Sequence, residues 1–317
     1  MVEIKLFPPR REINIISYNI HSGLNKNMFP TLFDTIDFLK QSNADIICLQ
    51  EVNESARAGF QVSSFKEELK MNSHFGANVV DLGFNYGLVT YSKYPIKGEE
   101  HIYLSSFREQ RGMLHTVVKV DYRKLNIINI HLGLDDEERG IQIRELLDFI
   151  KKLGDEPYIV VGDFNQGGVT VEEDILKDVA KELGKSNILT FPTGLDRIDY
   201  IFVSSNIEVI DYDVIIKDMS DHYPVFVDIR LPGSTSIENV EGEPDFNVYF
   251  DGVGERFCIQ GEMPLEQIDV YALTGQKMAG MKGENVTTVD VFGLSKGVYI
   301  VKGFSAGKSL VRKVIKE

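Results

Sequence analysis

The sequence contains no tryptophan and only two cysteines among its 317 residues. Cys48 lies in the apolar stretch DIICLQ and Cys258 lies far from it, so neither a disulfide framework nor a zinc-ligand spacing is visible. We expect Cys48 to be a small buried hydrophobic residue. No apolar run reaches the roughly 18 residues that a transmembrane helix needs, so we expect no membrane-spanning segment.

Basic residues are scarce, because 34 Lys and Arg stand against 48 Asp and Glu and leave a net charge of -14. Extended duplex nucleic-acid binding usually needs clustered Lys and Arg, so we do not expect it here. A small anionic substrate is not excluded, since a divalent metal can supply local positive charge. With 43% apolar and 26% charged residues, the chain is otherwise typical of a globular protein, and we expect a monomer.

The N-terminal stretch MVEIKLFPPRRE lacks the apolar core of a signal peptide. We therefore expect a protein that is secreted or at the cell surface if a leader precedes this sequence, and a cytoplasmic protein otherwise.

Residues 11–230 alternate apolar runs with polar, turn-rich connections. Helical spacing of apolar residues predicts helices at 30–41 and 138–153. The runs predicted to form strands are INIISYNI, DIICLQEV, FNYGLVTYS, MLHTVVKVDY, KLNIINIHL, YIVVGDFN, RIDYIFVS and HYPVFVDIRL. Because strands and helices mix throughout, this pattern predicts a layered α/β domain with mixed sheets over residues 1–231.

The composition changes after residue 231. Residues 232–245 are rich in Pro, Gly, Ser and acidic residues, which is typical of a linker. Short alternating runs separated by glycines follow over residues 246–317, and such spacing predicts a small β-sandwich without helices.

Polar side chains recur where the apolar runs of the first domain end. Loops at strand ends commonly carry chemistry, and oxygen-rich, thiol-free ligands suit Mg²⁺ or Mn²⁺ rather than zinc. Each residue alone has a structural explanation, since a Glu after a strand is usually solvated and Asp-Asn-Gly is an ordinary turn. The set is Asn19, Glu51, His131, Asp163, Asn165, Asp199, Asp221 and His222.

Taken in order, these stretches resemble the endonuclease/exonuclease/phosphatase superfamily, the metal-dependent phosphoesterases related to DNase I, exonuclease III and neutral sphingomyelinase. The combination looks most like a small bacterial branch of metal-dependent hydrolases. The resemblance covers residues 13–230 and implies a four-layer α/β sandwich of two mixed sheets. The matching stretches are ISYNIHSG, DIICLQEV, GLVTYSKYPI, RGML, INIHLGLDDEERGIQ, IVVGDFNQG, RIDYIFVS and SDHYPVFVDI.

The resemblance also implies a metal site. Glu51 is similar to the principal Mg²⁺ ligand of the family. Asn19 would support the metal and the phosphate, and Asp221 would complete the metal environment.

The remaining residues are expected to act on the water and the phosphate. Asp163 would align and deprotonate the attacking water, and Asn165 would orient it. His222, paired with Asp199, would contact the phosphoryl oxygens, and His131 would steady the charge on phosphorus.

Two further residues are candidates for substrate binding. His21 shares a strand face with Asn19 and is expected to touch the phosphate, although a structural hydrogen bond is the alternative. Arg111 in QRGML would clamp a phosphate, although a surface arginine is the alternative. Arg139 and Gln142, close on one helix, are expected to hold the HLGL loop in place.

The sequence does not identify the substrate. The superfamily includes nucleases, phosphatases and lipid phosphodiesterases, and no exposed aromatic hairpin of the membrane-docking kind is evident, so a small or soluble phosphoester is favoured. A catalytically inactive binding module and a structural adhesin are the alternatives from other classes. Mg²⁺-dependent release of nitrophenol from a bis-ester would distinguish the enzyme from both.

The C-terminal stretches IDVYALTGQKM, VDVFGLSKGVYIVKG and SLVRKVIKE resemble the sorting domain of the type IX secretion system. The resemblance covers residues 246–317 and implies a possible interaction with that secretion machinery. A generic immunoglobulin-like accessory domain is the alternative.

Overall fold

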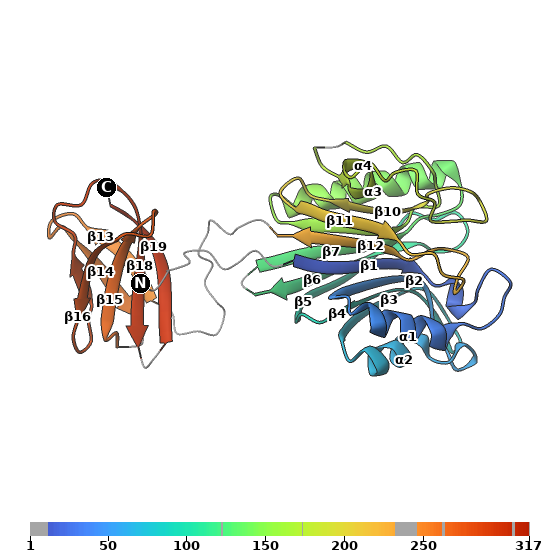
Figure 1. Ribbon diagram of the computed structural model, residues 1–317, viewed down its shortest axis with the longest axis horizontal. Helices are drawn as coiled ribbons and strands as arrows, with labels where there is room; N and C mark the ends of the chain where they lie inside the picture. Colours follow the sequence, from blue (N-terminus) through green and yellow to red (C-terminus); the bar gives the residue numbers. More distant parts are fainter. Residues whose placement is uncertain are drawn as a thin grey trace. The chain divides into compact units, whose positions relative to one another are not determined.

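The computed structural model of the protein describes residues 12–121, 123–172, 174–231, 246–261, 264–305 and 308–316. These residues form two compact units, one within 12–231 and the other within 246–316 (Figure 1). The predicted linker at 232–245 lies outside the described residues, so its boundaries remain a prediction. Within the described ranges, no helix is long and apolar enough to cross a membrane.

The first unit contains two six-stranded mixed sheets. Strand order in the first sheet is β11-β12-β1-β2-β4-β3, and in the second it is β5-β6-β7-β8-β10-β9. The first sheet comprises β1 (Glu12–Asn19), β2 (Ile46–Glu54), β3 (Asn72–Asp81), β4 (Phe84–Ser92), β11 (Glu208–Val214) and β12 (Val225–Arg230). The second comprises β5 (Ile96–Tyr103), β6 (Gly112–Val120), β7 (Arg123–His131), β8 (Tyr158–Asp163), β9 (Lys177–Asp178) and β10 (Asp199–Val203).

Helices cover the outer face of each sheet (Figure 1). The helices are α1 (Leu32–Ser42), α2 (Gln61–Leu69), α3 (Asp136–Leu153) and α4 (Val179–Glu182), with short 3-10 turns η1 (His21–Gly23) and η2 (Ala56–Ala58). Residues of α1 and α2 pack on the first sheet, and residues of α3 pack on the second. Asp135 caps α3 by accepting from the amides of Glu137 and Glu138, which defines where the helix begins.

Three clusters of buried apolar side chains lie between the sheets and helices of this unit and hold them together. Ile15 and Cys48 from the first sheet pack against Ile127 and Val161 from the second in the central layer. Burial of such aliphatic side chains contributes about 1.5–3 kcal/mol each, so this layer contributes strongly to the stability of the unit. The predicted four-layer α/β sandwich with two mixed sheets is therefore confirmed, as is the burial of Cys48.

Strands β3, β5 and β11 and helix α2 are present without having been identified from the sequence. Strands β3, β5 and β11 lie at sheet edges, and β5 exposes much of its surface, so its apolar signal is weak. Helix α2 buries only Gln61, Val62 and Phe65, which is too few apolar positions to show a helical period.

A buried polar connection fixes how the two sheets face each other. The side-chain amide of Asn129 on β7 donates to the carbonyl oxygens of Leu49 and Val89 in the opposite sheet, each at 3.0 Å. Its oxygen accepts from Gln50 Nε2 at 2.7 Å. Because a buried polar group without partners is costly, these bonds favour one relative position of the sheets.

Strand register brings the polar strand ends to one edge of the unit. Parallel pairing of β7 with β8 aligns His131 with Asp163, and antiparallel pairing of β8 with β10 aligns Asp163 with Asp199. In the first sheet, β1 and β2 run parallel, so Asn19 lies opposite Gln50, next to Glu51.

The C-terminal unit is all-β in its described residues. Its sheets have the order β13-β14-β17 and β16-β15-β18-β19. The strands are β13 (Phe246–Asp251), β14 (Arg256–Gly261), β15 (Gln267–Ala272), β16 (Lys277–Lys282), β17 (Thr288–Asp290), β18 (Gly297–Ser305) and β19 (Lys308–Lys316). A separate core that includes Phe257, Ile268, Val270 and Val301 lies within this unit, which confirms the predicted β-sandwich class.

Since each unit has its own apolar core, we predict that a chain truncated after Pro232 folds without residues 233–317. Circular dichroism and thermal unfolding should show a cooperative transition close to that of the first unit in the full chain. An insoluble or molten truncated chain would mean that the two units share a core.

Candidate active site

Five buried side chains meet at the edge of the sandwich where the strands end. Their exposed fractions are 0% for Asn19, 2% for His131, 1% for Asp163, 2% for Asp199 and 5% for His222. Such a concentration of buried polar groups is costly unless each group has a partner, so the contacts among them define the site.

Asn19 links the two sheets at the centre of the site. Its Nδ2 donates to Glu51 Oε1 and to Asp163 Oδ2, each at 3.0 Å. Its Oδ1 accepts from the backbone amide of His21 at 3.0 Å, which fixes the orientation of the side-chain amide. Asn19 therefore presents nitrogen to the two carboxylates and holds them, while its oxygen is already engaged.

The backbone turns Glu51 into the site. The pairing of β2 with β4 shifts register between Leu49 and Val52, so Glu51 lies in a β-bulge. Its φ of 57° is in the left-handed region, which non-glycine residues seldom adopt. Bulges re-aim side chains near active sites, and strain of this kind is commonly retained at functional positions.

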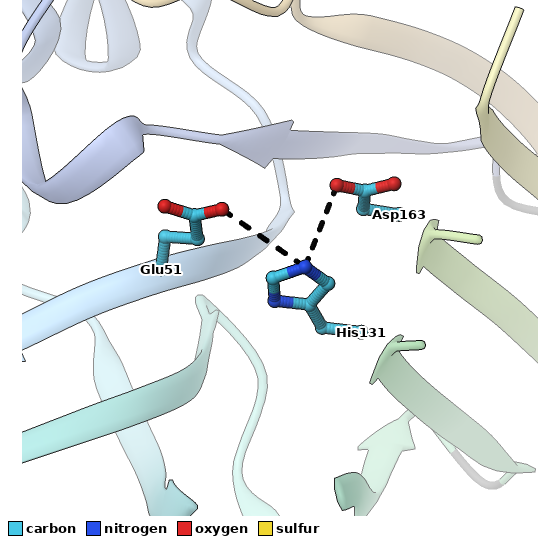
Figure 2. Close-up of side chains that lie close together, drawn as sticks. All are labelled: Glu51, His131 and Asp163. Carbon is cyan, nitrogen blue, oxygen red and sulfur yellow. Dashed lines mark ion pairs between the residues drawn. The ribbon is translucent and has the colours of Figure 1, made fainter. Parts of the chain in front are cut away.

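His131 faces both carboxylates, as Figure 2 shows. Its Nε2 lies 3.9 Å from Glu51 Oε1 and 3.6 Å from Asp163 Oδ2. Burial lowers the pKa of His131 well below its usual value, and the charge of Arg111 lowers it further, so the ring is neutral.

Donor groups lie beside both nitrogens of that ring. Arg111 Nη1 lies 3.2 Å from His131 Nδ1. Asn165 Nδ2 lies 3.1 Å from His131 Nε2 and donates to the carbonyl of Leu132 at 3.0 Å. The ring of His131 is thus held on two sides.

The stretch YIVVGDFN reaches the site through Gly162. At this residue φ is 144°, and an added Cβ would lie 1.9 Å from the carbonyl oxygen of Ile130 on the adjacent strand. Only glycine allows β7 and β8 to approach so closely at this point. Asp163 Oδ1 then accepts from the amide of Asn165 at 2.8 Å, and Asn165 itself has a left-handed φ of 49°.

Asp163, His222 and Asp199 form a carboxylate–imidazole–carboxylate arrangement. His222 Nδ1 lies 2.9 Å from Asp199 Oδ2, and its Nε2 lies 3.6 Å from Asp163 Oδ2. Burial lowers the pKa of His222, but the charges of Asp199 and Asp163 outweigh it and raise the pKa to about 10. Burial raises the pKa of Asp163 to about 7, although His222 lowers it in part.

His21 and Asp221 contact each other at the border of the site. His21 Nδ1 lies 3.6 Å from Asp221 Oδ1, and both side chains are partly exposed. Ser220 donates to the carbonyl of Asn19 at 2.8 Å and accepts from the amide of His222 at 3.2 Å, so it anchors this loop. Among the described contacts, Asp221 approaches His21 and Ser220 and none joins it to Glu51.

The loop after His131 is held by the residues predicted to hold it. Arg139 donates to the carbonyl of Gly133 at 3.2 Å, and Gln142 accepts from the Gly133 amide at 2.8 Å. The prediction for Arg139 and Gln142 is therefore confirmed.

The acidic and histidine side chains fit a divalent cation. Ligand atoms of Glu51, His131 and Asp163 all lie within 4.8 Å of one another. Two carboxylates with one imidazole suit a hard or borderline cation such as Mg²⁺ or Mn²⁺. The ligand set expected from the sequence, Glu51, Asn19 and Asp221, shares Glu51 with this cluster and stays a prediction.

Tyr86 belongs to the site although the sequence did not single it out. It hydrogen-bonds Glu51, and burial raises its pKa above the usual value. Tyr86 also lines a cleft of about 650 Å³ together with Asn53, Asn78, Phe84 and Arg108. The one available signal was its position in the predicted strand FNYGLVTYS, because this strand, β4, pairs with the bulged strand β2.

Comparison with known proteins agrees with this geometry. The model of the Endonuclease/Exonuclease/phosphatase family matches residues 16–222. The uncharacterized protein YbhP of Escherichia coli is 25% identical over 245 residues, which cover 68% of this chain and 96% of YbhP.

Solved structures share the fold at lower identity. An endonuclease/exonuclease/phosphatase from Beutenbergia cavernae has a TM-score of 0.65 and 18% identity, covering 96% of this chain and all of its own. A mannosyl-6-phosphatase from Bacteroides thetaiotaomicron has a TM-score of 0.55 and 20% identity, covering 68% of this chain and 99% of its own. Truncated TDP2 from Caenorhabditis elegans has a TM-score of 0.57 and 18% identity, covering 69% of this chain and 98% of its own.

The C-terminal unit matches a different model. Residues 247–317 match a secretion system C-terminal sorting domain. A sorting domain of this kind implies secretion or a cell-surface location.

The raised pKa of His222 yields a prediction that does not depend on activity. In metal-free protein, NMR should show the His222 ring titrating well above its usual value, near pH 10. Asp199→Asn removes the strongest attraction and should move the titration to lower pH. Asp221→Asn, a weaker and more distant attraction, should move it less.

The raised pKa of His222 also makes the stability of the fold depend on pH. A raised folded-state pKa contributes stability that is complete below about pH 6.5 and is lost as the pH rises through about 10. Unfolding experiments should therefore show a smaller alkaline loss in Asp199→Asn. An unshifted His222 titration in that variant would contradict the pairing.

Proposed function

The chain belongs to the Endonuclease/Exonuclease/phosphatase family, and from that premise we propose that its first unit is a Mg²⁺-dependent phosphoesterase. The reaction is hydrolysis of a phosphodiester or phosphomonoester by in-line attack of water. The observation that carries the proposal is the bridge from Asn19 to Glu51 and Asp163, which joins a ligand-type carboxylate and a base-type carboxylate at one point.

Glu51 would hold the cation beside Asp163 and His131, and Mn²⁺ would also fit. The cation, when bound, supplies positive charge that polarises the phosphoryl oxygens. Asn19 keeps both carboxylates in position, and Tyr86 holds Glu51 from the other side. Asp221 has the role of a neighbouring charge that orients His21, which lies at the border where the substrate phosphate enters.

Asp163 and Asn165 act on the attacking water in this proposal. Asp163 is held on two sides, by the amide of Asn165 at 2.8 Å and by Asn19 at 3.0 Å. Burial raises its pKa to about 7, the range in which a carboxylate accepts a proton at neutral pH. Asn165, with its amide fixed by the carbonyl of Leu132, orients the same water.

Two histidines act on the phosphoryl group. His222 is a cation because Asp199 and Asp163 flank it, so it attracts the phosphoryl oxygens. His131 is neutral and would steady the charge on phosphorus, and Arg111 holds its ring and adds positive charge nearby. Donors that are fixed before reaction stabilise developing charge without reorganisation.

Two alternatives remain within this chemistry. A nuclease is disfavoured for extended duplexes by the net charge of -14, and a lipid phosphodiesterase is the other alternative. An inactive binding module or an adhesin is less favoured because each residue of the polar set has a partner in the site.

The C-terminal unit would act as the export signal through type IX secretion machinery.

Glu51→Gln tests the cation site. The change keeps the side-chain shape and removes one negative charge, so Mg²⁺ affinity and hydrolysis of bis(p-nitrophenyl) phosphate should both fall strongly with the fold intact. Isothermal calorimetry and nitrophenol release are the measurements. Glu54→Gln is the matched control, because Glu54 lies on the same strand as Glu51 and its carboxylate accepts a hydrogen bond from Ser63 of α2. Unchanged Mg²⁺ affinity in Glu51→Gln would remove Glu51 from the ligands.

Asp163→Asn tests the base. Loss of a general base costs roughly 10²–10⁴-fold in rate, and the loss should fall on kcat with little change in KM. His222→Ala should impair kcat and KM together, and Asp199→Asn should reproduce part of that defect. Steady-state kinetics of the single and double variants is the measurement, and His222 with Asp199 should be far from additive. A near wild-type kcat in Asp163→Asn would end the role proposed for the stretch GDFN.

A further inference from the structure

An ion pair on the connection between β5 and β6 lies beside His131. Arg111 Nη1 is 2.6 Å from Glu109 Oε1 and 3.2 Å from His131 Nδ1. The side chain of Arg111 is 9% exposed, whereas that of Glu109 is 47% exposed. A nearly buried guanidinium is thus paired with a carboxylate that half faces the solvent, next to a histidine of the candidate site.

The backbone of Arg111 is held in place on both sides. Its amide donates to Ser106 Oγ at 2.9 Å, and its carbonyl accepts from the amide of Leu104 at 3.0 Å and from Gln110 Nε2 at 2.8 Å. Among the contacts of the described residues, the Glu109 carboxylate has only Arg111 as a hydrogen-bond or ion-pair partner. The guanidinium is therefore held more firmly than the carboxylate that pairs with it.

The carboxylate of Glu109 has space to leave this pair. Glu109 lines the cleft of about 650 Å³, together with Asn53 of β2, Asn78 of β3 and Tyr86 of β4. Rotation about the side-chain torsions of Glu109 turns its carboxylate from the guanidinium into this cleft, and the backbone need not move. Because the side chain is already half exposed, the carboxylate remains in contact with water in either position.

The same cleft opens next to the predicted cation ligand. Tyr86 lines the cleft and hydrogen-bonds Glu51. On the other side of the pair, His131 joins Arg111 to Glu51 and Asp163, because its Nε2 lies 3.9 Å and 3.6 Å from their carboxylates. The ion pair therefore borders the position that a substrate phosphate is proposed to take.

A phosphate and the Glu109 carboxylate would compete for one guanidinium. Both present anionic oxygens, and each forms charge-assisted hydrogen bonds of the same kind with an arginine. While Glu109 stays paired, its charge cancels that of Arg111 and adds to the negative charge of Glu51 and Asp163. An incoming phosphate then gains little from Arg111 unless the carboxylate moves away.

A fixed orienting role for Glu109 is the alternative. An orienting carboxylate is expected to be as buried and as well bonded as the group it holds, as Asp199 is beside His222. Glu109 is half exposed and has one partner, and Arg111 is already held through its backbone and through His131. These observations favour displacement over orientation.

We propose that Glu109 is a built-in competitor for the substrate phosphate at Arg111, which an incoming phosphate displaces into the cleft. Glu109 thereby lowers the affinity of the site for phosphate groups and sets KM. The role of Arg111 as a phosphate contact rests on the proposed function, whereas its ion pair with Glu109 does not.

The test uses the full chain with inorganic phosphate as the probe. Phosphate is titrated in isothermal calorimetry, which needs no activity, and is also measured as an inhibitor of bis(p-nitrophenyl) phosphate hydrolysis. Glu109→Gln removes the competing charge and keeps the side-chain shape. Glu99→Gln removes the same charge from an exposed position on β5 and is the matched control. Both changes are repeated in an Arg111→Gln background, and circular dichroism reports folding.

Glu109→Gln should bind phosphate about fivefold more tightly than the wild type, the factor by which a partly exposed ion pair competes. Its KM should fall by a similar factor with little change in kcat, because ground state and transition state gain equally. Glu99→Gln should behave like the wild type. In the Arg111→Gln background, Glu109→Gln should lose most of its effect.

Unchanged or weaker phosphate binding in Glu109→Gln would overturn the inference, and weaker binding would assign Glu109 the orienting role. An equal gain in Glu99→Gln, or a full gain without Arg111, would overturn it too, since general repulsion would then explain the effect. The comparison of Glu109→Gln with Glu99→Gln decides the matter even if Arg111→Gln does not fold. Absence of hydrolysis in every protein, with the phosphate affinities as expected, would contradict the proposed function alone.

Discussion

The double hydrogen bond from the Asn19 amide to Glu51 and Asp163 is the contact on which the site depends. Glu51 comes from the first sheet and Asp163 from the second, so this one side chain ties the chemistry to the packing of the two sheets. The buried bonds from Asn129 to the opposite sheet set that packing a few residues away. A shift of either sheet would therefore separate the carboxylates, and removal of their shared amide would take one donor from each of them.

The site combines groups whose charges are set in opposite directions by their surroundings. His131 and His222 are both buried, yet the pKa of His131 is lowered beside Arg111 and the pKa of His222 is raised beside Asp199. One ring is thus neutral and the other a cation, on the same edge of the same sandwich. Divergent environments of this kind assign acid, base and electrostatic roles in hydrolytic sites.

Strained backbone occurs inside the site. Glu51, in the bulge of β2, and Asn165, just after β8, both adopt left-handed backbone angles. The regular sandwich supplies the stability, and strained positions of this kind are commonly retained at functional sites.

The sequence by itself determined the fold class and the family and pointed to most of the residues that meet at the candidate site, because buried strands leave long β-branched runs and the polar residues follow those runs directly in YIVVGDFN and DIICLQEV. It did not reveal β5 or α2, whose apolar signal is weak where they are exposed. Only the tertiary structure decided that Asn19 offers nitrogen to the carboxylates, that Asp221 contacts His21, and that Tyr86 joins Glu51. These contacts depend on how side chains are oriented on strands that lie far apart in the sequence.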